Sequence, residues 1–177
     1  MAKSKTSWNW YHFDELSTRQ LYQIIALRVE VFALEQNCVY QDLDDKDQQA
    51  WHLCLWEDGS LIAYLRLLAP GVKYKEPSIG RVITSLNHRG MGLGRLLMQA
   101  GIAGTLERFP GAGIRLSAQQ HLEDFYKSLG FEPVGDIYFE DQIPHIEMYL
   151  LQDSSTRLRS SEPGAEAKKF LLKYRER

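Results

Sequence analysis

A glycine-rich run, Arg89–Arg95, contains the residues of this chain whose types and spacing most clearly suit binding chemistry. It follows an apolar, β-branched stretch, Ile79–Ile83, and precedes a segment rich in leucine, methionine and alanine. A strand, a glycine turn and a helix start in that order leave the first helical N–H groups unpaired at the positive end of the helix dipole. Glycines let these groups approach an anion without a Cβ in the way. The run therefore predicts a phosphate-binding loop, and the alternative is a turn that merely starts a helix.

Two common phosphate motifs do not fit this run. A P-loop needs a lysine after its last glycine, and none follows here. A dinucleotide fingerprint needs a third glycine where Leu97 stands. Read as Arg-x-x-Gly-x-Gly, the run resembles instead the acyl-CoA loop of the GNAT acetyltransferases, which holds the CoA pyrophosphate. The resemblance implies that CoA is bound at Arg89, Gly90, Met91, Gly92, Leu93, Gly94 and Arg95.

A second motif, Phe125–Phe131, lies about thirty residues downstream. It resembles the Tyr-x-x-x-Gly-Phe element that closes the acyl-CoA site of the GNAT proteins. Gln119 stands seven residues before Tyr126, where many members carry an asparagine that contacts the pantetheine arm. The resemblance therefore adds Gln119 and Tyr126 to the CoA site. Without it, Tyr126 would be read as a half-buried aromatic residue whose hydroxyl finds a partner.

The N-terminal half narrows the resemblance to one branch of the family. The segment Leu27–Gln36 is similar to the Arg-x-x-Val-Phe-x-x-Glu-Gln block of the ElaA-like GNAT proteins, although Ala33 stands where that block usually repeats a valine. Tyr64–Leu68 and Ile143–Ile146 fit the same branch. The likeness runs from about Trp8 to Leu151, but that branch supplies no substrate to carry over.

Acyl transfer needs a neutral amine, a stabilised thioester oxygen and a protonated leaving group. The resemblance implies an oxyanion donor in the main chain near Val82, and it adds Val82, Ile83 and Thr84 to the CoA site. It also implies that Tyr126 protonates the departing thiolate. Glu35 and His145 are the candidate bases, and for each a structural role is the alternative.

The acidic run Asp42–Asp47 invites a calcium interpretation. An EF-hand loop that starts at Asp42 would need glycine at its sixth position and glutamate at its twelfth, where the chain has Asp47 and Leu53. The run is then either a solvated loop or the frame of the acceptor entrance, where its charge would attract a cationic amine. No metal site is expected.

Composition indicates one globular domain. The chain has 177 residues, of which 44% are hydrophobic and 25% charged, and a net charge of −2. This charge gives no reason to expect nucleic acid or a membrane as a partner. No signal peptide or membrane span is visible, and two cysteines are too few for a disulfide framework, so a cytoplasmic location is expected. Cys54 lies in an alternating apolar run and is expected to be packed, whereas Cys38 could border the site.

The expected elements form an α/β mixed sheet. Ser17 with Gln20 makes a capping box before a helical pattern, and Asp58-Gly59 is a hairpin signal. Helices are expected after Ser17, after the glycine run and over 122–129, and strands over 8–13, 50–56, 61–68, 79–83, 114–118, 134–139 and 145–151. The GNAT resemblance implies a central twisted mixed β-sheet with helices on both faces and a V-shaped gap for CoA between the two central strands.

The domain boundary is expected at residue 151. Residues 152–177 combine a linker with Ala165–Arg177, which is either a frayed basic tail or a short amphipathic helix. Such a helix would dock on the same domain or on a second subunit, as in a homodimer.

Two classes of function remain. The favoured one is an acetyl-CoA-dependent N-acetyltransferase that acts on a primary amine of a small molecule or peptide, by direct attack in a ternary complex. The alternative is a catalytically idle acyl-CoA-binding module that serves a partner protein. An intact Tyr126 favours the enzyme, whereas a blocked acceptor side would favour the module.

Overall fold

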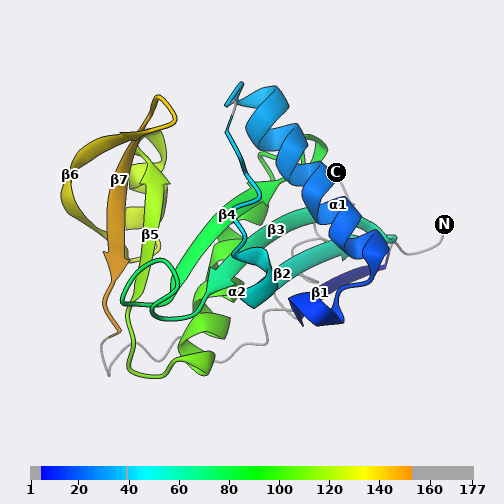
Figure 1. Ribbon diagram of the computed structural model, residues 1–177, viewed down its shortest axis with the longest axis horizontal. Coiled ribbons are helices and arrows are strands. Elements are labelled where there is room, and N and C mark those ends of the chain that lie inside the picture. The colour runs from blue at the N-terminus through cyan, green and yellow to red at the C-terminus, as the bar shows by residue number, and fades with distance from the viewer. Residues whose placement is uncertain (1–4, 39, 153–177) are drawn as a thin grey trace.

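The expected mixed sheet is present in the computed structural model, which describes residues 5–38 and 40–152 (Figure 1). Seven strands lie in the order β1-β2-β3-β4-β5-β7-β6, and β4 and β5 are the parallel neighbours in an otherwise antiparallel sheet. The strands are β1 Thr6–His12, β2 Ala50–Glu57, β3 Ser60–Leu68, β4 Ser78–Thr84, β5 Ile114–Gln119, β6 Glu132–Glu140 and β7 Ile143–Leu150. The helices are η1 Phe13–Glu15, α1 Thr18–Arg28, η2 Val29–Glu35, η3 Asp47–Gln49, η4 Leu86–His88, α2 Leu93–Arg108, η5 Gln120–Leu122 and α3 Glu123–Lys127.

Helix α1 starts and continues as its local sequence predicts. The Ser17 side chain accepts a hydrogen bond from the Gln20 N–H, and the Gln20 side chain accepts from the Ser17 N–H. The helix then widens into the π-helical segment η2, where the Gln36 N–H reaches back to the Val31 carbonyl at 3.1 Å. This segment ends at the Glu35-Gln36 pair, whose side chains contact Arg89 and Gln119.

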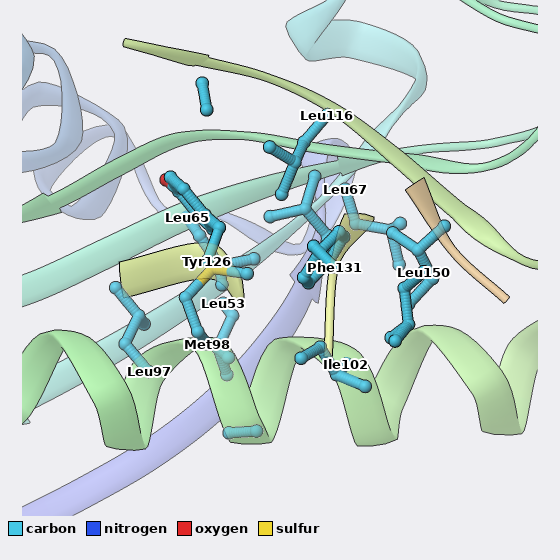
Figure 2. Close-up of a cluster of buried hydrophobic side chains, with 14 of the residues drawn as sticks. Leu53, Leu65, Leu67, Leu97, Met98, Ile102, Leu116, Tyr126, Phe131 and Leu150 are labelled. Atoms are coloured by element: carbon cyan, nitrogen blue, oxygen red, sulfur yellow. The ribbon is translucent and has the colours of Figure 1, made fainter. Parts of the chain in front are cut away.

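The two long helices cover opposite faces of the sheet (Figure 1). Cys54 and Tyr64 belong to the cluster under α1, whereas their strand neighbours Leu53 and Leu65 belong to the cluster under α2. This alternation is the period of a strand buried on both faces. Figure 2 shows the α2 cluster, in which the aliphatic chains of β2, β3 and α2 meet the rings of Tyr126 and Phe131. The expected burial of Cys54 is confirmed, since its side chain is fully buried.

The turn between β2 and β3 has the predicted hairpin geometry. Asp58 and Gly59 have φ of 49° and 82°, as a two-residue type I′ turn requires. This turn fixes the register that places Glu57 opposite Ser60.

Strands β4 and β5 separate soon after they meet. They share one register pair, Ser78 with Arg115, and β5 then continues beside β7. The predicted V-shaped gap between the central strands is therefore present, and in Figure 1 the sheet splays at this point.

Two expectations on elements differ from the structure. The helix expected over 122–129 is only α3, Glu123–Lys127, preceded by the turn η5. Strand β6 is longer than expected, and Gly135 in it has φ of 78° at a register shift between Val134 and Tyr138. The expected tail helix, and its docking on a second subunit, lie outside the described residues. No helix within the described part is long and apolar enough to cross a membrane.

Candidate active site

A pocket opens where β4 and β5 diverge. Its walls come from η2 and the segment after it, the middle of β4, the end of β5, α3, and the turn between β6 and β7. Elements far apart in the sequence therefore meet around one cavity. The lining residues are Phe32, Gln36, Cys38, Tyr40, Ile79, Gly80, Arg81, Val82, Gln119, Leu122, Tyr126, Glu140, Asp141, Ile143 and His145.

The glycine loop at the start of α2 has the geometry of an anion site. Gly90 and Gly92 have φ of 72° and 76°, a conformation that residues with a Cβ adopt only at a cost. Within the described residues, the main-chain N–H groups of Gly90–Gly94 have no hydrogen-bond partner. The ordinary helix ladder begins only when the Leu96 N–H reaches the Gly92 carbonyl. A row of free N–H groups at a helix N-terminus fits the pyrophosphate of CoA.

The two arginines that flank this loop bind other parts of the protein. The Arg89 guanidinium donates to both carboxylate oxygens of Glu35 and approaches the Thr84 carbonyl at 3.4 Å. Arg95 donates to the Ser128 hydroxyl at 2.7 Å and lies over the Phe125 ring. These contacts brace the loop against η2 and α3.

Glu35 therefore differs from its expected surroundings. It does not line the pocket, and its carboxylate forms an ion pair with Arg89. This hydrogen bond holds the pKa of Glu35 below its usual range and raises the pKa of Arg89. A carboxylate held in its charged form by a guanidinium is a weak base.

Tyr126 has its ring in the core and lines the pocket. The side chain is 6% exposed and packs edge-on against Phe125 and Phe131, at 5.1 and 6.0 Å between ring centroids. Figure 2 shows the ring inside the cluster, with the red hydroxyl oxygen at the edge. The hydroxyl makes no hydrogen bond to a described residue and is not fully buried, since Tyr126 lines the pocket. Burial raises the pKa of Tyr126 to about 12, so the phenol holds its proton at neutral pH.

His145 enters the pocket from β7. Its Nδ1 lies 2.8 Å from the Ile143 carbonyl, which can only accept a hydrogen bond, so Nδ1 carries the proton. The Nε2 lone pair is then available, and no described residue binds it. The ring lies beside Tyr138, and in the sheet it is opposite Gln119. An oriented imidazole with a free nitrogen can accept a proton.

Gln119 bridges the gap between the two halves of the sheet. Its Nε2 donates to Gln36 Oε1 at 3.0 Å, which joins the end of β5 to the end of η2. Gln36 belongs to the Glu-Gln block singled out in the sequence, but nothing there indicated this partner. The amide is positioned at the pocket that it was expected to border.

Strand β4 is irregular at the pocket. The register with β3 shifts between Tyr64 and Arg66, and Arg81 has φ of 54°, which is costly for a non-glycine residue. The next residue, Val82, lines the pocket, whereas Ile83 turns into the cluster under α1. Thus Arg81 and Val82 together lie opposite the single residue Leu65 in a bulge, the kind of irregularity that re-aims backbone groups at active sites.

The acidic run is neither the solvated loop nor the open frame of the acceptor entrance that its sequence left as alternatives, because its carboxylates are mostly paired with arginines. The Asp42 carboxylate accepts from Arg28 at 2.7 Å and from Arg81 at 2.6 Å. Both Asp47 oxygens accept from Arg28 at 2.9 Å. Arg66 pairs with both Asp44 and Asp47. Asp42 also accepts from the Tyr40 hydroxyl, and Asp44 also pairs with Arg81 and Lys46.

This network is largely buried. Arg28 and Arg66 are 1% and 3% exposed, and their charges are balanced by the carboxylates. Burial by itself would raise the pKa of Asp47, but the two guanidinium groups hold it below its usual range. The same balance lowers the pKa of Asp44. The run therefore anchors the loop to α1, β3 and β4, and Asp45 is its exposed member.

Several pocket residues were absent from the sequence-based predictions. Arg81 lies over the rings of Phe32 and Tyr40, and its pairing with Asp42 could not be read from local patterns. Glu140 and Asp141 stand just before the Ile143–Ile146 motif, separated from it by Gln142, and that position was the available signal. Cys38, considered as a bordering residue, does line the pocket. Across 5–38 and 40–152, no three His, Cys, Asp or Glu side chains gather to hold a metal ion.

Comparisons with known proteins agree with this geometry. The family model described as the acetyltransferase (GNAT) domain matches residues 16–152. Protein ElaA of Escherichia coli is 42% identical over 143 residues, which cover 80% of this chain and 94% of that protein. A UPF0039 protein of Synechocystis is 45% identical, with 80% and 93% covered. The structure of an acyl-CoA N-acyltransferase from Pseudomonas aeruginosa superposes with a TM-score of 0.79 at 40% identity, covering 82% of this chain and 99% of that one.

Proposed function

The chain belongs to the GNAT acetyltransferase family, within which it is similar to ElaA, and is an acyl-CoA-dependent acyltransferase; we propose that it transfers an acetyl group from acetyl-CoA to a primary amine of a small molecule or peptide. The amine attacks directly in a ternary complex. The observation that carries this proposal is the shared pocket of Tyr126 and His145. One offers a protonated hydroxyl without a partner, and the other a free imidazole nitrogen.

The glycine loop binds the donor. The pyrophosphate of acetyl-CoA accepts hydrogen bonds from the main-chain N–H groups of Gly90–Gly94. Arg89 and Arg95 brace the loop, and Gln119 meets the pantetheine arm in the gap between β4 and β5. The thioester then lies beside Val82, Ile83 and Thr84, where a main-chain N–H near Val82 stabilises the charge that develops on its oxygen.

His145 prepares the acceptor. Nε2 takes a proton from the ammonium group, directly or through one water, and the neutral amine attacks the thioester carbonyl. A C–N bond forms and the C–S bond breaks, with the electron pair leaving on sulfur, and the attacking nitrogen releases its second proton to water. The Tyr126 hydroxyl gives its proton to this thiolate and later regains one from solvent. In this scheme Glu35 holds Arg89 and takes no proton, so His145 is the proposed base.

A thiol-release assay with acetyl-CoA tests the proposal. The panel contains polyamines, amino acids, aminoglycosides and peptides, and mass spectrometry identifies the acetylated product. At least one primary amine is expected to release CoA in proportion to the acetylated amine formed. CoA binding without any acetylated amine across the panel would contradict the proposal and favour an idle binding module.

The loop itself is tested by Gly92→Val. A β-branched side chain at φ of 76° strains the loop and blocks the approach of the phosphates, so calorimetry should find CoA affinity reduced at least a hundredfold, about 2.7 kcal/mol. Gly111→Val is the matched control because Gly111 has φ of 82° beyond the far end of α2. It carries similar strain but should bind CoA like the wild type. Normal CoA binding by the Gly92 variant would refute the role of the loop.

A further inference from the structure

The charges around the pocket are not all neutralised within the protein. Arg81 lines the pocket, and its guanidinium donates hydrogen bonds to the Asp42 carboxylate at 2.6 Å and to the Asp42 main-chain carbonyl at 3.0 Å. Glu140 and Asp141 also line the pocket, and neither has an ion-pair partner among the described residues. The charge left uncompensated on the lining is therefore negative.

The Glu140 carboxylate is oriented without being neutralised, and Asp141 is placed by the main chain of its turn. The Ser117 hydroxyl donates to Glu140 Oε2 at 3.2 Å and is itself hydrogen-bonded to Tyr138 at 2.5 Å. Asp141 stands in the tight β6–β7 turn with φ of 50°, and its carbonyl lies 3.9 Å from the Cys38 sulfur. A neutral hydroxyl orients a carboxylate but leaves its charge available to a ligand.

The field of both carboxylates extends across the pocket. Burial raises the pKa of the Cys38 thiol, and the charges on Asp141 and Glu140 raise it further. Lys73 is a cation that interacts with the charge of Glu140, but its ammonium group lies 5.1 Å from the centre of the Tyr74 ring and forms no ion pair within the described residues. The turn is therefore electrostatically suited to a further cation.

A separate group in this pocket is also open to a ligand. The Tyr126 ring is buried, but its hydroxyl lies at the pocket lining and makes no hydrogen bond to a described residue, so it can bind a ligand that enters. The lining also includes apolar walls from Phe32, Leu122 and Ile143. A matching ligand would place a reacting end at Tyr126 and His145, a short apolar linker along these walls, and a cationic end at Glu140 and Asp141.

We infer that the acceptor is a primary amine that carries a second cationic group, as in a diamine, a polyamine or a basic peptide side chain. The second cation binds Glu140 and Asp141 at the β6–β7 turn, while the reacting amine lies between His145 and the thioester. This inference rests on the proposed function, which supplies the reaction. It assigns the two carboxylates to the choice of substrate rather than to chemistry.

Three acceptors with the same carbon chain test the inference. Diaminobutane has a second positive charge, butylamine has none, and aminobutyrate has a negative charge. With acetyl-CoA, kcat/KM should be about tenfold or more higher for diaminobutane than for butylamine, and lowest for aminobutyrate. The advantage should shrink as ionic strength rises, because salt screens partly exposed charges.

Variants identify the groups responsible. Combining Glu140→Gln with Asp141→Asn should abolish most of the preference for diaminobutane, measured as the ratio of its kcat/KM to that of butylamine in the same variant. Both replacements keep the shape of the side chain, and asparagine tolerates the positive φ of Asp141. Asp136→Asn is the control, since Asp136 is an exposed carboxylate on β6 that does not line the pocket.

The outcomes separate this inference from the proposed function. Equal kcat/KM for diaminobutane and butylamine, an unchanged preference in the double variant, or turnover of other amines but not of diaminobutane would each overturn the inference alone. Absence of acetylated product with every primary amine tested would instead overturn the proposed function.

Discussion

Replacing Tyr126 by phenylalanine should separate catalysis from binding. The change removes one oxygen from a ring that stays 6% exposed among Phe125 and Phe131. Because no described residue uses that hydroxyl, no partner is left unsatisfied, and the free energy of unfolding should change by less than about 0.5 kcal/mol. The pocket loses the proton donor that we assign to the thiolate.

The rate effect follows from the state of the hydroxyl. With its pKa raised to about 12, only about one tyrosine in a thousand is ionised at pH 9, so the wild type keeps its acid throughout the usual assay range. General acids contribute roughly a hundred- to ten-thousandfold. A thiolate is a comparatively stable leaving group, so we expect about a hundredfold loss of kcat, which corresponds to about 2.7 kcal/mol.

The assay measures thiol release at saturating acetyl-CoA with an amine whose acetylation has been verified. The KM for acetyl-CoA should change less than about twofold, since the phosphates bind at the main chain of the glycine loop. Tyr22→Phe is the matched control, because Tyr22 is 74% exposed on α1. An unchanged kcat in the Tyr126 variant, with the chemical step rate-limiting, would refute the assignment. Equal losses in both variants would do so as well.

Three further predictions concern stability. Asp47→Asn removes a negative charge that balances two buried guanidinium groups, and it should lower the free energy of unfolding by about 3–5 kcal/mol in urea titrations. Asp45→Asn is the control, because Asp45 is an exposed carboxylate in the same loop and its replacement should change the free energy of unfolding by less than about 0.5 kcal/mol. Similar values for the two variants would contradict the network. Folding lowers the pKa values of Asp44 and Asp47, so the stability they contribute is complete above the unfolded pKa of about 3.9 and is lost as pH falls through the lower folded values. In Asp47→Asn, the free energy of unfolding should therefore fall less steeply as the pH is lowered. A pH dependence identical to that of the wild type would be inconsistent with this linkage. Gly104→Ala should lower the free energy of unfolding by about 1–3 kcal/mol, measured by thermal unfolding, because the new Cβ would lie 2.6 Å from the Trp10 ring. Replacing glycine by alanine in a helix usually stabilises a protein, and that result here would show that the ring moves aside.

Local sequence determined the parts of the fold that depend on neighbouring residues. The capping box of Ser17 and Gln20 and the hairpin at Asp58-Gly59 were predictable because each needs only contacts within a few residues. The glycine loop Arg89–Arg95 was predictable for the same reason, since its anion-binding geometry is a property of a turn that enters a helix. Together with the Phe125–Phe131 motif, it was sufficient to identify the family and the fold.

The partners of the charged side chains were decided by tertiary structure. The acidic run looked available to a substrate, yet Asp44 is paired with Arg66, 22 residues away on β3. Glu35 looked like a base, yet it is paired with Arg89, 54 residues away.

Glu140 and Asp141 have no ion-pair partner among the described residues, and their signal in the sequence was their place just before the Ile143–Ile146 motif. A local pattern fixes where a charge lies along the chain, but whether that charge is neutralised depends on which residues the sheet brings within about 4 Å, because Coulomb attraction and desolvation act through space.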